Sequence, residues 1–180
     1  MRRPRGRLLL LLAGALLVAG VGAAAIASAR SPARPAASQG GPARPAPGTA
    51  EYLLHGQGHQ VAVAHLEVAA TPAARERGLM GRTRVAPGTG MAFLFPADTA
   101  TGFWMKGTLV PLSIAFVAAD GRVVAVREMT PCLGDPCPVY GPGRSYRYAV
   151  ELAAGAFAAA GVGEGSQVVP RDTDSLPTAS

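Results

Sequence analysis

The sequence predicts a mainly β domain, a compact antiparallel sandwich or barrel with one or two short helices. Two observations lead to this fold class. Short apolar runs, many rich in β-branched residues, recur along residues 51–170, and glycine, proline or aspartate separates them. In the clearest case, residues 111–129, two such runs flank Asp120-Gly121, which is a preferred dipeptide of tight hairpin turns.

A short helix is expected early in the domain, in TPAARERGLMG at residues 71–81. Thr71 suits the N-cap, because its hydroxyl can accept a backbone N–H of the first turn. Pro72 suits that turn, where its missing N–H costs no hydrogen bond. Gly81 suits the C-terminal end, so the helix is predicted to run from Thr71 to Gly81.

The remaining elements are short strands and one more helical turn. Glycine or proline bounds most of the apolar runs, which limits each strand to a few residues. AGAFAAAG, residues 154–161, can form one or two turns of helix. Besides the hairpin, strands are expected at 61–69, 90–95, 102–105, 146–152 and 166–169.

The first 29 residues are predicted to direct the chain out of the cytoplasm. Four arginines in MRRPRGR precede an uncharged apolar run at residues 8–27, and the small residues ASA occupy 27–29. This order is typical of a cleaved signal peptide, but about 20 apolar residues can also span a bilayer. A cleaved signal peptide and a retained membrane anchor both stay open, and both place the domain outside.

Residues 30–50 and 171–180 are predicted to be disordered segments on either side of a single domain, residues 51–170. The first segment is mostly proline, alanine, glycine and serine, a composition that cannot form a core. The second, RDTDSLPTAS, is a polar terminal tail.

The net charge of +6 does not indicate a nucleic-acid-binding domain. Residues 1–50 contain seven arginines and no acid, whereas residues 51–180 contain ten basic and eleven acidic residues. Proteins that bind nucleic acid carry their positive charge on the folded domain. Nucleic acid is therefore not an expected partner.

The cysteines are expected to form a disulfide. Cys132 and Cys137 lie in TPCLGDPCPVYGPG with four residues between them. In an exported chain such a pair most simply forms a disulfide that shapes its loop, and redox-active pairs more often have two intervening residues. The histidines, His55, His59 and His65, have no further ligand at a recognisable spacing, so neither a metal nor a cofactor is expected.

The motif GFWMKGT holds the only tryptophan and the only lysine, while the other 16 basic residues are arginines. A lysine in such a chain indicates a position that favours a compact ammonium. Trp104 and Lys106 share one face of a strand. Lys106 either lies across the indole at the surface, or the pair lines a shallow cleft with Arg77 or Arg82. That cleft would suit a neutral or anionic ligand with a flat or apolar face, such as a glycan or an acidic metabolite.

Several motifs occur in a fixed order along the domain: RERGLMGR, GMAFLF, FWMKGT, PLSIAF, DGRVV, GDPCPVYGPG and YRYAVEL. In these motifs the chain resembles the domain of unknown function 192 family, also called uncharacterised protein family 0127, over residues 61–169. The resemblance implies a compact β-rich fold and frequent export, and it implies no established activity. Gly107 and Ser113 stand where the family typically has Asn and Asp, which removes a carboxylate that a mechanism could use.

Two functions are compatible with these features. The first is a secreted or anchored cell-envelope domain that binds a small molecule or glycan or serves as an accessory module; a retained N-terminal segment would make the membrane a partner. The alternative is a hydrolase or lyase that acts on an envelope polymer and uses Lys106, Glu76, Arg77 and Tyr140. The missing Asp at Ser113 favours binding. The candidate ligand-binding residues are Trp104, Lys106, Arg77, Arg82 and Tyr140.

Export can be tested directly. A reporter fused after residue 60 should be active only outside the cytoplasm, because the basic and apolar N-terminal segments precede the fusion point. Reporter activity in the cytoplasm would contradict export. Mass spectrometry of the mature chain distinguishes the two forms, since cleavage leaves Arg30 as the first residue and anchoring leaves Met1.

Overall fold

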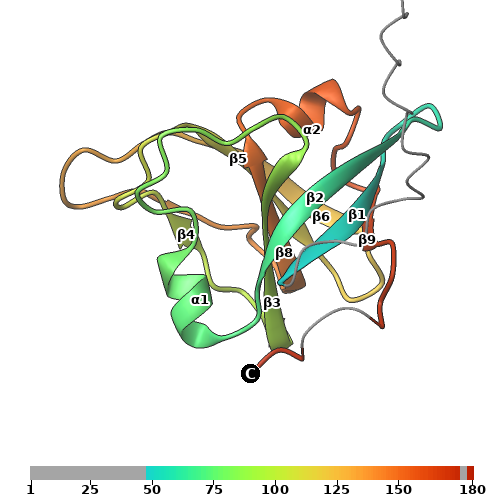
Figure 1. Ribbon diagram of the computed structural model, residues 1–180, viewed down its shortest axis with the longest axis horizontal. Coiled ribbons are helices and arrows are strands. Elements are labelled where there is room, and N and C mark those ends of the chain that lie inside the picture. Colours follow the sequence, from blue (N-terminus) through green and yellow to red (C-terminus); the bar gives the residue numbers. More distant parts are fainter. Residues whose placement is uncertain (1–47, 175–177) are drawn as a thin grey trace, which may run out of the picture. The chain divides into compact units, whose positions relative to one another are not determined.

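The computed structural model describes residues 48–174 and 178–180 (Figure 1). The predicted signal peptide or anchor, residues 1–29, and residues 30–47 of the predicted linker lie outside the described residues. Among the described residues, no helix is both long and apolar enough to cross a membrane.

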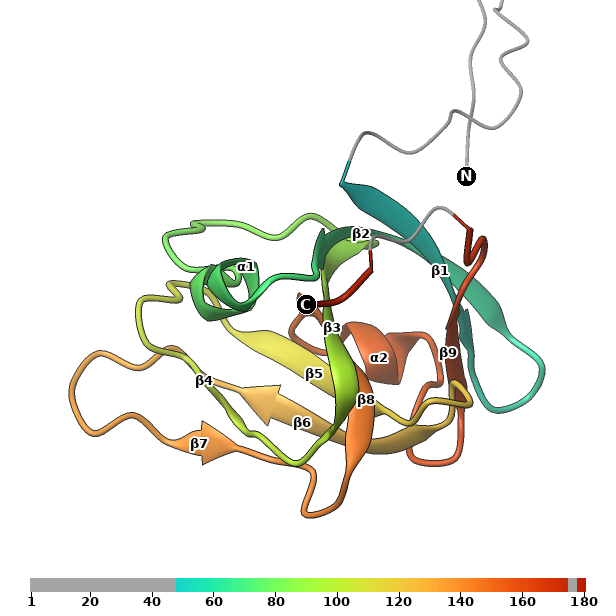
Figure 2. The same ribbon diagram turned by 90° about the horizontal axis from the view of Figure 1, so that it is seen from below.

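The domain is built on one strongly curled sheet of seven strands, with a separate two-stranded ribbon and two short helices (Figures 1 and 2). The strand order in the sheet is β6-β5-β8-β3-β2-β1-β9. The predicted mainly β fold with short helices is confirmed. The strands are β1 (Thr49–His55), β2 (Val61–Ala69), β3 (Thr89–Thr99), β5 (Leu112–Val117), β6 (Val123–Met129), β8 (Tyr146–Ala153) and β9 (Gln167–Pro170).

All neighbouring strands of the sheet are antiparallel except β2 and β3, which are parallel. Parallel neighbours require a crossover connection, and here it contains helix α1 (Pro72–Arg77). The ribbon pairs β4 (Phe103–Trp104) with β7 (Val139–Tyr140), and it lies beside α1 in both ribbon views. The crossover therefore brings α1 to the side of the sheet that carries β4.

The sheet curls far enough for its two ends to meet at one point. Val123 N–H donates to the Ser166 carbonyl oxygen at 2.8 Å, and Val168 N–H donates to the Gly121 carbonyl oxygen at 2.9 Å. These bonds join the predicted Asp120-Gly121 turn, between β5 and β6, to the start of β9. Helix α2 (Ala156–Ala159) places Phe157 in the core enclosed by this curl.

Each face of the sheet has its own apolar core, so the central strands are buried on both faces. All six residues of β5 are buried. In β8, Tyr148, Val150 and Leu152 pack into the core enclosed by the curl, while Ala149 packs into the opposite core. This opposite core, which we call the outer core, includes Leu79, Phe93, Met105, Ile114, Phe116 and Tyr146.

The helix prediction was correct at its start and wrong at its end. Thr71 is the N-cap, and its Oγ1 accepts the Ala74 N–H at 3.3 Å. The helix ends at Gly78 rather than Gly81, because Gly78 leaves helical geometry with φ 48° while its N–H still donates to the Ala74 carbonyl oxygen. Gly81 instead donates its N–H to the carbonyl oxygen of Gly107 at 2.8 Å.

Two strands of the structure were not predicted. Strand β1 begins at Thr49 and buries Ala50, Tyr52 and Leu54 in the core enclosed by the curl. Strand β7 is only two residues long, and its partner β4 supplies its hydrogen bonds. Beyond the expected domain end, the Arg171 guanidinium contacts Glu51 Oε2 at 2.7 Å.

A close approach between β3 and β8 can be tested at Gly90. A Cβ at this position would overlap the backbone carbonyl oxygen of Glu151, so Gly90→Ala should lower the free energy of unfolding by about 3 kcal/mol. The matched control is Gly163→Ala, where a Cβ meets open space. Urea unfolding measures both, and equal losses in the two variants would contradict the strand spacing described here.

Candidate functional site

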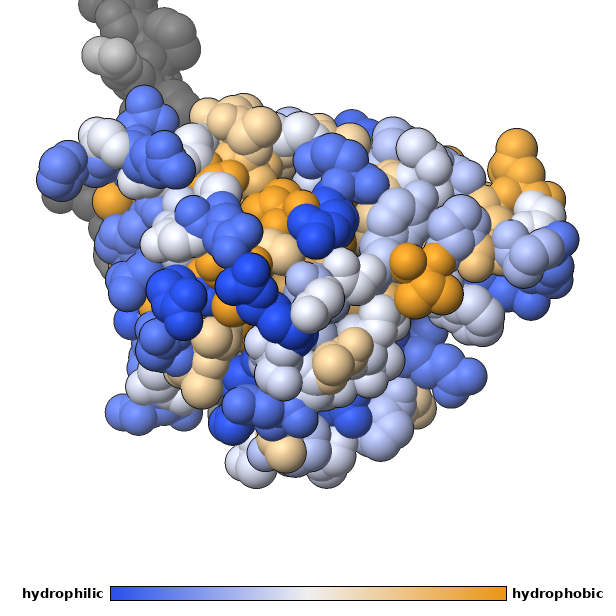
Figure 3. All heavy atoms as spheres, turned by 180° about the vertical axis from the view of Figure 1, so that it is seen from behind, coloured by the Kyte–Doolittle hydropathy of each residue, from blue (hydrophilic) through white to orange (hydrophobic). Residues whose placement is uncertain are grey.

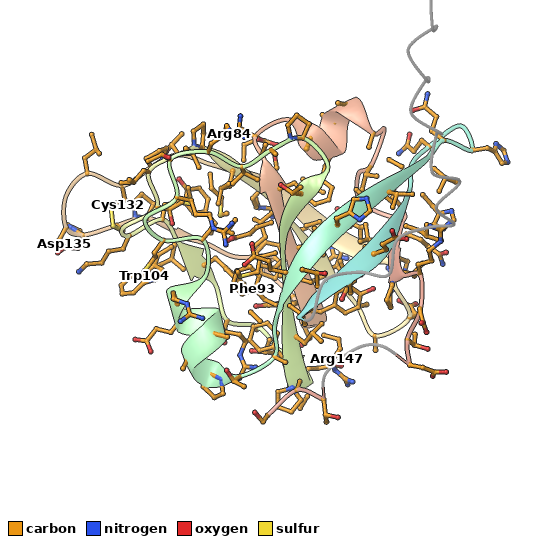
Figure 4. All side chains as sticks on the ribbon, in the orientation of Figure 1. Arg84, Phe93, Trp104, Cys132, Asp135 and Arg147 are labelled. Carbon is orange, nitrogen blue, oxygen red and sulfur yellow. A yellow bond between two sulfur atoms is a disulfide. The ribbon has the colours of Figure 1, made fainter. Side chains whose placement is uncertain are left out.

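A narrow inner pocket lies between α1, the residues that follow it, and β4. Its volume is about 30 Å³. It adjoins a wider outer cleft of about 300 Å³, and the two share Arg75, Glu76, Phe103 and Trp104 in their walls. Figure 4 shows Trp104 next to helix α1. The inner pocket is also lined by Arg77, Gly78, Leu79, Met80, Phe93, Thr108 and Glu151.

Glu151 is the unusual residue of the inner pocket. It lies on β8 opposite Met91 of β3 and Ile114 of β5, on the face of the outer core, and it is only 5% exposed. Among the described residues its carboxyl group has no hydrogen-bond or ion-pair partner. Burial raises the pKa of Glu151 to about 8, so the carboxyl group is mainly protonated at neutral pH.

The sequence analysis did not select Glu151 as a site residue. It placed this residue only in the strand motif YRYAVEL. The available signal was a carboxylate between Val150 and Leu152 in a strand otherwise rich in apolar residues. Glutamate is rarely buried without a partner. Whether it is buried at this position depends on neighbouring strands that are far away in the sequence.

Two arginines of α1 have different roles at the site. The Arg75 guanidinium donates to the carbonyl oxygens of Ala70 and Leu94, each at 2.8 Å, and lies over the Phe95 ring. These contacts attach α1 to the sheet. Arg77 also lines the pocket, is exposed, and has no ion-pair partner among the described residues, so its charge is available to a ligand.

Trp104 and Lys106 are adjacent. Lys106 lies across the indole at the surface, which is the first of the two arrangements predicted from the sequence. Lys106 Nζ lies 5.6 Å from the centroid of the Trp104 ring and 3.2 Å from Asp135 Oδ2. Met105 points the other way, into the outer core. Trp104 is 49% exposed and lines both the inner pocket and the outer cleft, whereas Lys106 faces the loop of residues 132–137.

The structure therefore brings together only part of the predicted ligand-binding set. Arg77 and Trp104 line the same pocket, and Lys106 reaches the edge of this site only through its contact with the indole. Arg82 is paired with Glu67 at 2.6 Å and is not part of the pocket wall. Tyr140 lies opposite Phe103 in the ribbon, with its hydroxyl 3.3 Å from Thr130 Oγ1.

Cys132 and Cys137 form a disulfide, as their spacing predicts. The bond closes a projecting loop just before β7, and Cys132 also forms a backbone bridge with Lys106. Leu133 in this loop is 98% exposed, and Figure 3 shows an apolar projection at that end of the domain. The disulfide thus stabilises the loop that leads into the partner strand of Trp104, and disulfides are typical of oxidising compartments.

The residue at position 113 lies away from the pocket. Ser113 Oγ donates to Glu128 at 2.7 Å and accepts the Gly155 N–H at 2.7 Å, next to α2. Its neighbour Ile114, on the other face of β5, is the residue opposite Glu151. Glu128 supplies a carboxylate where the family typically has Asp, so the replacement by Ser113 does not argue against chemistry in the pocket.

The backbone conformation at position 107 accounts for a glycine there. Gly107 has φ 69°, a conformation that glycine and asparagine adopt more readily than other residues. The change from the family's typical Asn therefore retains the turn that leads into Thr108, which is buried in the pocket wall.

The described histidines do not form a metal site. His65 Nδ1 lies 3.4 Å from Glu51 Oε1, and none of the three histidines lines the inner pocket or the outer cleft. Within residues 48–174 and 178–180, no group of three or more His, Cys, Asp or Glu side chains is arranged to hold a metal ion.

These features define a small β-rich domain with a buried carboxyl group in a surface pocket. The chain belongs to the DUF192 family, described as Uncharacterized ACR, whose model matches residues 53–170. The family assignment made from the motifs is thereby confirmed. No curated protein matches the chain.

Two similar crystal structures support the fold. One is a protein from Sinorhizobium meliloti 1021 described as a proposed transcription regulator: it is 28% identical, the match covers 71% of this chain and 95% of that one, and the TM-score is 0.63. The other is a protein of unknown function from Novosphingobium aromaticivorans DSM 12444. It is 25% identical, the match covers 67% of this chain and 84% of that one, and the TM-score is 0.58.

The buried state of Glu151 predicts a pH dependence of stability. Its folded pKa of about 8 exceeds the ordinary value of 4.5, so between these values the folded chain holds a proton that the unfolded chain has released. Stability should therefore fall as pH rises from about 5 to 8, by about 1.4 kcal/mol per pH unit at most.

Glu151→Gln removes this proton and should remove this part of the slope, as measured by urea unfolding at several pH values. Glu76→Gln, which changes an exposed carboxylate of the same pocket, is the matched control and should retain it. Parallel stability curves for the wild type and Glu151→Gln would show that Glu151 is not a buried neutral acid.

Proposed function

We propose that this chain is a small-molecule-binding domain that works outside the cytoplasm and holds its ligand in the inner pocket and outer cleft. The observation that carries the proposal is Glu151, a buried carboxyl group that faces a pocket without a partner among the described residues. The carboxyl group is largely removed from water, and a ligand that supplies a hydrogen bond would offset part of this cost, which is about 1–3 kcal/mol for a fully buried polar group without a partner.

The walls of the site also favour a ligand. Trp104 keeps an exposed aromatic surface at the entrance, and Arg77 provides an unpaired charge on the α1 side. Clefts of about 300 Å³ lie at the lower end of the range for small-molecule sites. These features favour a small ligand that contacts one aromatic wall and reaches inward with a polar group.

An extracytoplasmic location is supported by two separate features. The basic and apolar N-terminal residues are typical of exported chains, and the Cys132–Cys137 disulfide is typical of an oxidising compartment. A secreted form and a membrane-anchored form are both consistent with this location.

Binding has stronger support than the enzymatic alternative. A hydrolase would need a base or nucleophile in contact with the acid, whereas no hydrogen bond joins Glu151 to another side chain among the described residues. Of the residues suggested for catalysis, Glu76 and Arg77 line the pocket, while Lys106 and Tyr140 are engaged elsewhere.

A ligand screen by thermal shift tests this function. The library should contain small carboxylic acids, their amides, amines and monosaccharides, and at least one compound should raise the Tm of the full-length chain. Trp104→Ala should weaken binding of that compound about tenfold, or about 1.4 kcal/mol, because it removes the aromatic wall.

Leu133→Ala is the matched control, since it also removes an exposed apolar side chain but lies outside the inner pocket and outer cleft. Binding should be unchanged in this variant. The proposal fails if no compound stabilises the chain, or if Leu133→Ala weakens binding and Trp104→Ala does not.

A further inference from the structure

We propose that the ligand of this site is a small monocarboxylate with a flat apolar body, and that its carboxylate group lies in the inner pocket between Glu151 and Thr108. This inference rests on the proposed binding function and specifies its ligand class. Four features of the site support it: the space available, the donors that face this space, the charges around it, and the apolar walls outside it.

The space limits the size of the group that enters. The inner pocket, at about 30 Å³, is much smaller than the outer cleft of about 300 Å³, so a ligand would place a compact polar group inward and its larger body in the cleft. A carboxylate group, with only two oxygen atoms, is a compact anionic head of this kind.

Two residues that can donate an O–H line this space, Glu151 and Thr108. The protonated carboxyl group of Glu151 has one O–H donor, and burial holds its pKa at about 8 so that the donor is present at neutral pH. Thr108 is 6% exposed and lines the same pocket, and its hydroxyl has no hydrogen-bond partner among the described residues. One donor is therefore available for each oxygen of a carboxylate, and hydrogen bonds to an ionised acceptor are the stronger kind.

The charged groups around Glu151 favour an anion over a cation. Helix α1 contributes Arg75, Glu76 and Arg77 to the pocket, which gives one net positive charge while Glu151 is protonated. The neighbouring strands β3 and β5 place the uncharged residues Met91 and Ile114 opposite Glu151. An amine would have to approach two guanidinium groups, whereas a carboxylate is attracted by them.

The outer cleft accounts for the rest of the ligand. Its apolar wall consists of Pro72, Phe95, Phe103 and Trp104. A planar ring can lie against these side chains while its carboxylate reaches inward to Glu151. Aromatic and short cyclic monocarboxylates have this shape, and long-chain or polyanionic compounds do not.

The test compares benzoate with benzamide and benzylamine, which have a similar ring and carry a negative, neutral or positive head. Titration of the ¹⁵N-labelled full-length chain by NMR gives affinities, and the single indole N–H of Trp104 reports on the site. At pH 6.5, benzoate should bind at least tenfold more tightly than either of the other compounds and should shift the Trp104 signal.

The pH profile distinguishes the Glu151 proton from a general attraction to arginine. Benzoate stays ionised between pH 6 and 9, so its affinity should fall toward tenfold per pH unit above about 8, where Glu151 ionises and repels it. Glu151→Gln retains an N–H donor without an ionisable proton. It should still bind benzoate, and its affinity should not change over this pH range.

Arg77→Ala should reduce the preference for benzoate over benzamide about tenfold. Arg84→Ala is the matched control, because Arg84 is an exposed arginine outside the pocket walls, and it should leave the preference unchanged (Figure 4).

The outcomes separate this inference from the proposed function. If benzamide or benzylamine binds as tightly as benzoate and shifts the Trp104 signal, the carboxylate class is wrong and small-molecule binding stands. The class is also wrong if none of the three compounds binds while another library member does so in a Trp104-dependent way. If benzoate binds with the same pH profile in the wild type and in Glu151→Gln, the hydrogen bond from the protonated Glu151 to the ligand is overturned.

Discussion

Strand β8 is the constraint on which the rest of the molecule depends. It lies between β3 and β5, and its side chains enter both cores, so both of its faces are shielded from water. Gly90 allows β3 to approach the Glu151 backbone closely. A carboxyl side chain in such a strand cannot be solvated in the ordinary way, and its protonated state follows from its position.

The pocket exists because α1 and the β4–β7 ribbon cover this strand incompletely. Arg75 attaches α1 to the sheet through the carbonyl oxygens of Ala70 and Leu94, and the T-shaped contact of Phe93 with Phe103, 4.9 Å between centroids, attaches β4. Between these two attachments the buried Glu151 side chain lines the narrow inner pocket. The same contacts that stabilise the outer core thus determine the width of the site.

The two departures from the family motifs have different structural meanings. At Gly107 the backbone conformation is the property that matters, and both glycine and asparagine satisfy it. At Ser113 the hydroxyl and the Glu128 carboxylate of the neighbouring strand together accept the Gly155 N–H, so a carboxylate is still present beside this position. Neither position is itself part of the pocket wall, and the single lysine, Lys106, contacts the Trp104 indole and Asp135.

Local patterns in the sequence determined the features that depend on nearby residues: the hairpin around Asp120-Gly121, the N-cap at Thr71, the cysteine pair, and the shared face of Trp104 and Lys106. The alternation of Ala50, Tyr52 and Leu54 in β1 was also present in the sequence, but it follows directly after a segment rich in proline and alanine.

Only the tertiary structure decided which of these residues meet. Contacts between segments far apart in the chain determine the parallel pairing of β2 with β3 and the pairing of β4 with β7. A contact of the same kind pairs Arg82 with Glu67, so that Arg82 does not join Arg77 in the pocket wall. Glu151 is the clearest case. Its strand pattern is local, but its burial comes from β3, β5 and α1, and burial rather than residue type makes this carboxyl group a neutral hydrogen-bond donor.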